Sequence, residues 1–295
     1  MRVLVTGAAG FTGRYVLQAL RARGWEAIGA VHGRLPGPDE VAFDLGDAQA
    51  VAAAVQAVRP QAVIHLAAIA FVAHEDVEAI YRVNVVGTRH VLAALAALPQ
   101  RPEAVLLASS ANVYGNATAP SIHEDTPPAP TNDYAVSKLA MEYLARTWMG
   151  RLPIVIARPF NYTGVGQSER FVIPKLVAHF ARRAPEVSLG NIEVAREFND
   201  VRMVSDAYVR LLERGVAGQV YNVCTGRAVS LREVIGRLES LTGHRLAVRV
   251  DPALVRANEV VRLAGDNRRL VAAIGPLRDI SLRETLGWML AEARG

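Results

Sequence analysis

The sequence predicts an α/β protein built on a doubly wound parallel sheet. Its first half alternates short, continuously apolar runs with amphipathic helical runs, and a glycine-rich turn joins the first apolar run to the first helix. Continuous apolar runs are typical of strands that are buried on both faces. Their alternation with helices indicates parallel strands joined by helical crossovers. We therefore expect helices on both faces of one parallel sheet, followed by a smaller C-terminal α/β part.

Each element of the first half follows from this pattern. Strands are expected at residues 2–7, 26–31, 62–68, 104–110 and 154–159, and helices at residues 12–24, 47–58, 76–98 and 132–149. After Pro159 the alternation stops. Helices are then expected at residues 171–183, 203–214, 230–242 and 281–293, with strand-like pieces at 187–190, 219–223 and 246–250.

Composition narrows the class of protein and its surroundings. The 295 residues are 51% hydrophobic and 21% charged, which is ordinary for a globular protein with a sizeable core. Cys224 is the single cysteine, so no internal disulfide can form. The chain has no apolar run near the ~20 residues that span a bilayer, and no signal-peptide pattern. We expect a cytoplasmic protein without a membrane partner.

The positive charge does not indicate a nucleic-acid partner. The net charge is +5, but the arginines are scattered among acidic residues and form no runs with interleaved aromatic residues. An anionic small ligand accounts for the excess at least as well.

A glycine-rich turn follows the first predicted strand. The segment VTGAAGFTGR places Gly7, Gly10 and Gly13 between that strand and the first helix. Glycines there let the backbone approach a pyrophosphate, whose charge the helix N-terminus stabilises. The spacing is GxxGxxG rather than the GxGxxG of the common dehydrogenase fingerprint, and a purely structural turn is the alternative. The position between a strand and a helix favours a dinucleotide site.

The residues after the second predicted strand favour NADP over NAD. NAD-preferring enzymes usually place a carboxylate there, which bonds the adenosine ribose. Here His32 and Arg34 follow the strand, and the first carboxylate is Asp39. A guanidinium attracts the 2′-phosphate that a carboxylate would repel. We expect Arg34 to contact NADPH, with NAD as the second choice; a solvated loop cation is the alternative for Arg34.

A Tyr–Lys pair lies near the start of the helix predicted at residues 132–149. Tyr134 and Lys138 are four residues apart, so they share one helical face. An ammonium near a phenol favours the phenolate and lowers a tyrosine pKa that starts near ~10. We expect Tyr134 to exchange protons near neutral pH, with a surface pair as the alternative. The preceding strand ends at Ser109 and Ser110.

Six motifs in order along residues 5–161 together resemble the extended short-chain dehydrogenase/reductase family. They are TGxxGFxG, HLAA, Asn84 in RVNVVGT, SSANVYG, YxxxK and ARPFN. The resemblance implies that Ser110 binds the reacting oxygen, Tyr134 is the acid/base, and Lys138 holds the nicotinamide ribose and tunes Tyr134. Asn84 matches an asparagine that supports a lysine–water relay, and a role in bending the helix is the alternative.

The same resemblance implies two domains and completes the cofactor site. A Rossmann domain is expected over residues 1–159 and about 200–228, and a nucleotide-sugar-binding domain over residues 160–199 and 229–295. The expected dinucleotide contacts are Gly7, Gly10, Phe11, Thr12, Gly13, His32, Arg34, Asp44, Leu45, Leu66, Ala67, Ala68, Tyr134 and Lys138. No metal site is expected.

The second half resembles the GDP-6-deoxy-4-keto-sugar reductases that form GDP-D-rhamnose. The matching segments are NDYAVSKLAME, ARPFNYTGVGQSERFVIPK, REFNDVRMVSDAYVRLL and GQVYNVCTG. Related chains act on neighbouring sugars and form GDP-6-deoxytalose. The substrate contacts implied are Ser110, Asn112, Tyr134, Asn161, Arg196, Arg256 and Glu259. The last two lie in RANEV, which departs from the family's RPxEV at Ala257, and a surface salt bridge is the alternative for each arginine.

The two residues after Ser110 restrict the reaction. Related 4,6-dehydratases carry acidic or Ser/Glu pairs there, which protonate the departing hydroxyl and remove the C5 proton. Ala111 and Asn112 cannot exchange protons near neutral pH. We therefore expect reduction of a C4 ketone by hydride transfer. An NAD-retaining nucleotide-sugar 4-epimerase and a non-catalytic dinucleotide-sensing regulator are the alternatives.

The resemblance also implies a homodimer. In the family, helices equivalent to residues 76–98 and 132–149 pair across subunits in a four-helix bundle. The apolar stripe in VLAALAAL allows this pairing, and a stripe that faces the core of one chain would look the same.

Overall fold

A computed structural model describes residues 1–70, 76–117, 119, 121–252 and 262–294. Its centre is a seven-stranded sheet in which every neighbouring pair is parallel. The strand order is β11 (Val220–Val223), β6 (Ile154–Pro159), β5 (Ala104–Ala108), β4 (Ala62–His65), β1 (Arg2–Thr6), β2 (Glu26–Val31) and β3 (Glu40–Ala42). This arrangement confirms the predicted fold class.

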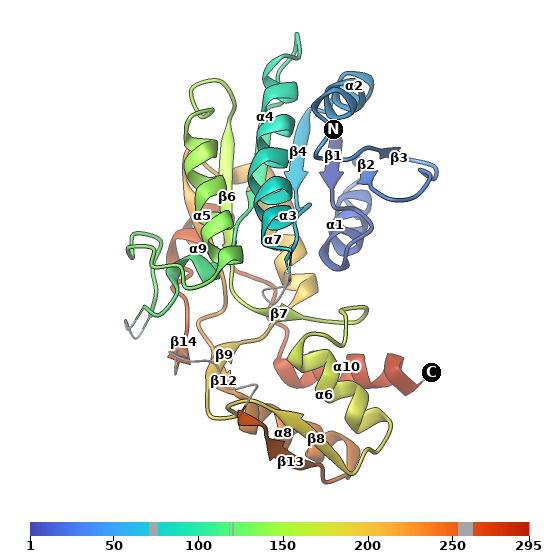
Figure 1. Ribbon diagram of the computed structural model, residues 1–295, viewed down its shortest axis with the longest axis vertical. Helices are drawn as coiled ribbons and strands as arrows, with labels where there is room; N and C mark the ends of the chain where they lie inside the picture. Colours follow the sequence, from blue (N-terminus) through green and yellow to red (C-terminus); the bar gives the residue numbers. More distant parts are fainter. Residues whose placement is uncertain (71–75, 118, 120, 253–261, 295) are drawn as a thin grey trace.

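Helices cover both faces of the sheet (Figure 1). One face packs against α1 (Phe11–Ala22), α7 (Val201–Arg214) and α9 (Arg268–Ile274). The other packs against α2 (Ala48–Val58), α4 (Thr88–Ala96) and α5 (Asp133–Arg146). The strands are buried on both sides, which explains why their sequences are continuously apolar rather than alternating.

The sheet reverses its winding direction between β1 and β4. The chain passes from β1 outward to β2 and β3, then returns to β4 on the opposite side of β1. In open parallel sheets, the crevice outside the carboxyl ends of two such strands is the usual ligand site. The two strand ends carry Thr6 and His65.

The helix predicted at residues 76–98 forms, but it is not a regular α-helix throughout. It consists of α3 (Val77–Tyr81), a π-helical segment η1 (Arg82–Gly87) and α4. π-helical turns insert one wide turn into an α-helix and occur often at functional sites. The short helix α9 was not predicted, because seven residues give too little periodicity to recognise.

A second apolar core lies beyond the carboxyl ends of the sheet (Figure 1). Its helices are α6 (Val172–Ala181), α8 (Leu231–Thr242) and α10 (Leu282–Arg294), packed with the pair β8 (Glu186–Leu189) and β13 (Ala247–Val250). Shorter strands connect the two cores: β7 (Tyr162–Thr163), β9 (Ala195–Glu197), β10 (Asn199–Asp200), β12 (Ala228–Ser230) and β14 (Arg262–Leu263). Among the described helices, none has the length and apolar character needed to cross a membrane.

Candidate active site

The glycine-rich turn packs directly against the loop after β4. Gly7 has φ +70, and a Cβ there would lie 2.8 Å from the backbone nitrogen of Ala67. A Cβ on Gly13 would overlap the carbonyl oxygen of Gly7. Helix α1 starts after Gly10, which supplies no side-chain cap for its first amides. The turn therefore presents unblocked amides at a helix N-terminus, as a pyrophosphate requires.

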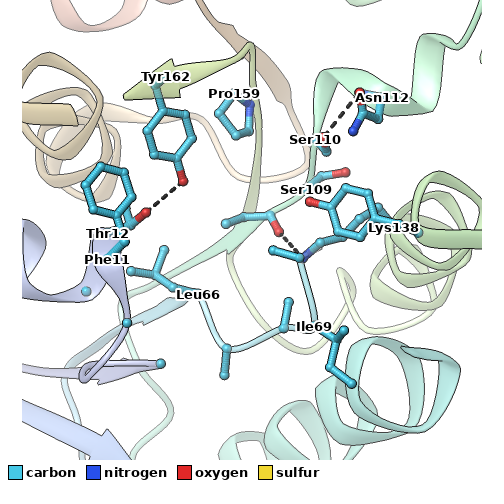
Figure 2. A pocket seen from close by; sticks show the side chains of 18 of the residues that line it. Phe11, Thr12, Leu66, Ile69, Ser109, Ser110, Asn112, Lys138, Pro159 and Tyr162 are labelled. Carbon is cyan, nitrogen blue, oxygen red and sulfur yellow. Dashed lines mark hydrogen bonds between the residues drawn. The ribbon is translucent and has the colours of Figure 1, made fainter. Parts of the chain in front are cut away.

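One cavity of about 1530 Å³ runs along the carboxyl ends of the strands. Every expected dinucleotide contact except Arg34 lines it: Gly7, Gly10, Phe11, Thr12, Gly13, His32, Asp44, Leu45, Leu66, Ala67, Ala68, Tyr134 and Lys138. The shape of the glycine turn and this lining fit a dinucleotide. Thr12 and Tyr162 share a 2.7 Å hydrogen bond between their hydroxyls, and the Phe11 and Tyr162 rings are stacked (Figure 2).

The side chain of Arg34 is engaged elsewhere. Both terminal nitrogens of its guanidinium donate to Glu40 on β3, at 2.8 and 2.7 Å. Glu40 also accepts from the amide of Gly37, so it folds the loop after β2 back on itself. Glu40, which directly follows Asp39 in the sequence, was not among the predicted site residues. The pairing of β3 with β2 places Glu40 opposite Gly29, and neither Glu40 nor Arg34 lines the cavity.

Ser110, Tyr134 and Lys138 meet at the end of β5, and each is less than a tenth exposed. The Ser110 and Tyr134 side chains form a hydrogen bond. The Lys138 ammonium donates to the carbonyl oxygen of Ala108 at 2.8 Å. Ser110 Oγ also accepts from the amide of Asn112 at 3.1 Å (Figure 2). The structure thus brings the three predicted groups to one wall of the cavity.

The expected direction of the Tyr134 pKa is wrong for this structure. Burial raises the pKa of the Tyr134 phenol above its usual value, and the hydrogen bond with Ser110 opposes that rise. Lys138 is turned toward Ala108 and is not among the groups that lower it. Burial also lowers the pKa of Lys138 to about 8, while Glu142 acts in the opposite direction. The burial of both side chains depends on tertiary packing and could not be predicted from the local sequence.

Asn84 lies in η1 and contacts two elements of the site. Its amide oxygen accepts from the backbone nitrogen of Ile69 at 2.8 Å, and its amide nitrogen donates to the Ile69 carbonyl and the Ser137 hydroxyl. Ser137 in turn donates to the carbonyl oxygen of Tyr134. In the structure, Asn84 therefore joins the loop after β4 to the helix that carries Tyr134 and Lys138.

His65, the first residue of the HLAA motif, is buried, and no role was predicted for it. Its ring bridges Thr6 on β1, at 2.7 Å, and Thr88 at the start of α4, at 2.9 Å. Burial, and then the nearby Lys138 ammonium, lower the pKa of His65 to about 3. His65 is thus a neutral ring that ties two strand ends to α4. A histidine that ends an apolar strand was the signal that could have identified it.

Three predicted substrate contacts line the opposite end of the cavity: Asn112, Asn161 and Arg196. Arg256 and Glu259 lie outside the described residues. Other polar residues that line the cavity were not predicted, namely Asn116, Gln167, Ser168 and Arg170. They come from loops, where periodicity carries no information.

Acidic groups are almost absent from the lining. Among the described residues that line the cavity, Asp44 is the only carboxylate, and it is one of the expected dinucleotide contacts. Ala111 is buried, and Asn112 is the polar side chain that follows Ser110 into the cavity. No group of His, Cys, Asp or Glu suited to a metal ion occurs in the part of the chain that the structure describes.

The chain belongs to the NAD dependent epimerase/dehydratase family, whose model matches residues 3–224. It is 37% identical to a GDP-6-deoxy-D-mannose reductase from Pseudomonas aeruginosa, over 99% of this chain and 96% of that protein. It is 30% identical to a GDP-6-deoxy-D-talose 4-dehydrogenase from Aggregatibacter actinomycetemcomitans, over 93% of this chain and 92% of that protein.

Solved structures show the same fold over the whole chain. RMD from Pseudomonas aeruginosa, in complex with NADPH, has a TM-score of 0.88 and 34% identity, and covers 100% of this chain and 99% of that chain. A Burkholderia cenocepacia structure, described provisionally as an epimerase, has a TM-score of 0.94 and 51% identity, over 99% and 98% of the two chains.

Proposed function

We propose that this member of the epimerase/dehydratase family is an NADPH-dependent reductase of the C4 ketone of a nucleotide 4-keto-6-deoxyhexose. The preferred substrate is GDP-4-keto-6-deoxy-D-mannose, and the product is GDP-D-rhamnose or its talose epimer. One observation carries the proposal: Ser110, Tyr134 and Lys138 share a cavity wall on which no described residue supplies a carboxylate. Such a wall suits hydride transfer and lacks the groups for dehydration.

Each residue of the wall has a part in the reduction. NADPH supplies the hydride that adds to C4. Ser110 donates a hydrogen bond to the C4 oxygen, and Tyr134 transfers its phenolic proton to that oxygen as negative charge develops. Lys138 stabilises the phenolate that Tyr134 becomes, because an ammonium lowers the energy of a neighbouring anion. Burial of Tyr134 and Lys138 excludes water, so these electrostatic effects act at short range in a low dielectric.

The relatives support the substrate class. The Pseudomonas and Aggregatibacter relatives act, by their names, on GDP-linked 6-deoxyhexoses and cover nearly all of this chain. Arg196 and Asn161, which line the sugar end of the cavity, are the groups that we assign to the diphosphate. A guanidinium binds phosphate oxygens through paired donors.

NADPH is the preferred dinucleotide in this proposal. The structure of the Pseudomonas relative contains NADPH, and Arg34 follows β2. In this proposal, Arg34 gives up one of its two hydrogen bonds to Glu40 and donates to the 2′-phosphate instead. An exposed ion pair of this kind contributes only ~0.2–1 kcal/mol, so a doubly charged phosphate can displace it.

The decisive experiment offers the protein NADPH and a panel of nucleotide 4-keto-6-deoxy sugars. We expect oxidation of one NADPH for each GDP-linked ketone consumed, and NMR then assigns the C4 configuration of the product. Failure with every GDP-linked ketone would overturn the substrate, while reduction of a different nucleotide's ketone would keep the reaction class.

A nucleotide-sugar 4-epimerase is the second candidate. The provisional description of the Burkholderia structure favours it, and so does the pairing of Arg34 with Glu40, which occupies the cation that we assign to the 2′-phosphate. An epimerase retains NAD and returns the hydride, so it converts a saturated nucleotide sugar without net consumption of dinucleotide. Absorbance at 340 nm during turnover separates the two candidates, since an epimerase leaves the NADPH signal constant.

We also propose that the chain forms a homodimer through α3, η1 and α5. Large apolar side chains are exposed on these neighbouring elements: Val77, Val86, Val136 and Tyr143, between 38% and 54% exposed. Light scattering should give about twice the 31.8 kDa of one chain, and a V86D/Y143D variant should give the monomer mass. A wild-type monomer at micromolar concentration would overturn this proposal.

The domain division and the location are proposals of the same kind. Residues 1–159 and 200–228 are proposed to bind the dinucleotide, with α9 packed beside α7. Residues 160–199 and the rest of 229–295 are proposed to bind the nucleotide sugar. A cytoplasmic site fits the buried, unpaired thiol of Cys224.

A further inference from the structure

A buried ion pair lies directly behind the catalytic wall. The carboxylate of Glu142 on α5 receives two hydrogen bonds from the guanidinium of Arg158 on β6, at 2.9 and 2.6 Å. Both side chains are at most 3% exposed. A buried ion pair gives little net stability compared with an apolar pair of the same volume. Its presence one turn after Lys138 therefore needs a reason other than stability.

Glu142 holds the strand end that carries Ser110. The hydroxyl of Ser109 donates to Oε1 of Glu142 at 2.5 Å. Ser110 has extended backbone, with φ −159 and ψ 147, and successive side chains on extended backbone point to opposite sides. Holding the Ser109 hydroxyl on Glu142 therefore also fixes the direction of the Ser110 side chain, which lies beside Tyr134.

Arg158 keeps Glu142 from moving. Its Nη1 donates to the Tyr114 hydroxyl at 2.9 Å and to the carbonyl oxygen of Glu124 at 3.2 Å. Tyr114 in turn donates to the side chain of Asn222 on β11 at 2.7 Å. The Glu142 carboxylate on α5 is thus bound by Ser109, which follows β5, and by Arg158 on β6. These bonds fix its position relative to the sheet.

Glu142 is also the negative charge that faces Lys138. The two side chains are four residues apart on α5, so they share a helical face. The other titratable groups near Lys138 are Tyr134 on the same helix and His65 on β4, and beyond Tyr134 lie the phenols of Tyr162 on β7 and Tyr208 on α7. His65 and these phenols are uncharged at neutral pH, because burial disfavours their charged forms.

We propose that Glu142 is a positioning residue of this site: fixed by Arg158, it orients Ser110 through Ser109 and supplies the charge that keeps Lys138 an ammonium. The proposal rests on the proposed function for its catalytic meaning. Its electrostatic part concerns the protein alone and is measured without any substrate.

The chain offers an unusually direct measurement. It contains only two lysines, Lys138 and Lys175. Labelling lysine with ¹³C at Cε therefore gives two side-chain NMR signals, and a K175R variant assigns them. The pH midpoint of the Lys138 signal reports its ionisation directly. Lys175 donates to the carbonyl of Ser188 in the second core and serves as an internal reference.

The main variant is E142Q/R158M, which removes both charges and leaves an amide oxygen to accept from Ser109. The single variant E142Q would leave Arg158 as a buried unpaired charge and endanger folding. We expect the Lys138 midpoint of the double variant to fall by about half a pH unit, because the lost Glu142 carboxylate lies on the same helical face as Lys138, while the loss of the Arg158 guanidinium offsets part of the fall. A midpoint within 0.3 pH units of wild type in the folded double variant would overturn the electrostatic part.

A matched control neutralises another buried pair. D200N/R202M removes the ion pair between a fully buried Asp200 and Arg202 at the start of α7. This variant should leave the Lys138 midpoint unchanged. An equal fall in both double variants would show a general effect of mutation and overturn the proposal.

The positioning part is tested by E142D, which keeps the charge and the ion pair but withdraws the carboxylate from Ser109. We expect the Lys138 midpoint to stay within 0.3 pH units of wild type, while kcat falls about tenfold with little change in KM. A kcat within twofold of wild type would overturn the positioning part. Because E142D retains the pair, it also tests the proposal if E142Q/R158M does not fold: a midpoint lowered by a full unit there would overturn the electrostatic part.

These outcomes are separable from the proposed function. If no nucleotide sugar is reduced, the proposed function fails, yet the Lys138 midpoint still rises or falls with the charge of Glu142. If a sugar is reduced but the midpoint does not respond to E142Q/R158M, the function stands and the role of Glu142 fails.

Discussion

The two ends of the cavity are built in different ways. At the dinucleotide end, a short stretch from Gly7 to Gly13 supplies backbone amides, and its shape depends on the absence of side chains. At the sugar end, the polar groups come from separate segments, among them Asn112, Asn161 and Arg196. Under the proposed function, the first end recognises its ligand through backbone shape and the second through side-chain chemistry. Such a division lets related proteins keep the same cofactor while their substrates differ.

The largest expected effect lies between the two ends, at Tyr134. Y134F removes the only proton that the proposed mechanism delivers to the C4 oxygen, so kcat should fall by about 1,000-fold. Binding at both ends should persist, because the phenol is confined to the wall between them. Steady-state kinetics and calorimetric titration of NADPH check the two statements. Turnover within tenfold of wild type would contradict the assignment.

The second effect should be confined to the dinucleotide end. G13A places a methyl group against the backbone of Gly7 and Ala8, which must then move. We expect NADPH to bind about 100-fold more weakly, as for a displacement of ~1 Å in a site of this kind. Binding of GDP at the sugar end should be unchanged. The matched control is G236A in α8, where a new Cβ meets nothing within 4 Å.

A smaller effect should sharpen the choice of dinucleotide. R34A should raise the KM for NADPH about tenfold and leave the KM for NADH unchanged, because only NADPH carries the 2′-phosphate. E40Q should act in the opposite direction by releasing Arg34 from its pair. The ratio of kcat/KM for the two dinucleotides measures both variants. If neither substitution moves that ratio, Arg34 has no part in dinucleotide selection.

The smallest effect is a dependence on pH. The pKa of Lys138 is lowered to about 8, so the ammonium is lost as pH rises through that value. The rate of reduction should fall about twofold between pH 7 and pH 8, and more steeply above. The residues of the turn from Gly7 to Gly13 have no titratable side chain, so the pyrophosphate contacts should not change with pH over this range. A rate that rises from pH 7 to pH 9 would exclude this role of Lys138.

The same difference between local and distant contacts determines which features could be predicted from the sequence alone. The order of the elements and the glycine turn follow from local patterns, since apolar periodicity and backbone shape are written in neighbouring residues. Tyr134 and Lys138 could be paired because helix geometry fixes residues four apart. The pKa directions of Tyr134 and Lys138 could not be foreseen correctly, because they depend on how deeply the sheet and α7 bury both groups.

Contacts between residues far apart in the sequence also could not be predicted. The pair of Arg34 with Glu40 needs the loop between β2 and β3 to fold back, and nothing in HGRLPGPDE states that it does. Likewise, Glu142 appears as an ordinary polar residue within YAVSKLAMEY until β6 brings Arg158 beside it. The π-helical segment η1 was also not predicted, because its six residues are too few to show a change of period in the apolar pattern of residues 76–98.

That segment has a consequence for how the chain can evolve. Removing one residue from η1 would restore a regular α-helix. The residues on one side of the deletion would then be rotated by about 100° relative to those on the other side. Asn84 could then no longer reach Ile69 and Ser137 while Thr88 still meets His65. We expect the number of residues between Asn84 and Thr88 to be invariant among functional descendants, even where every surface loop has gained or lost residues.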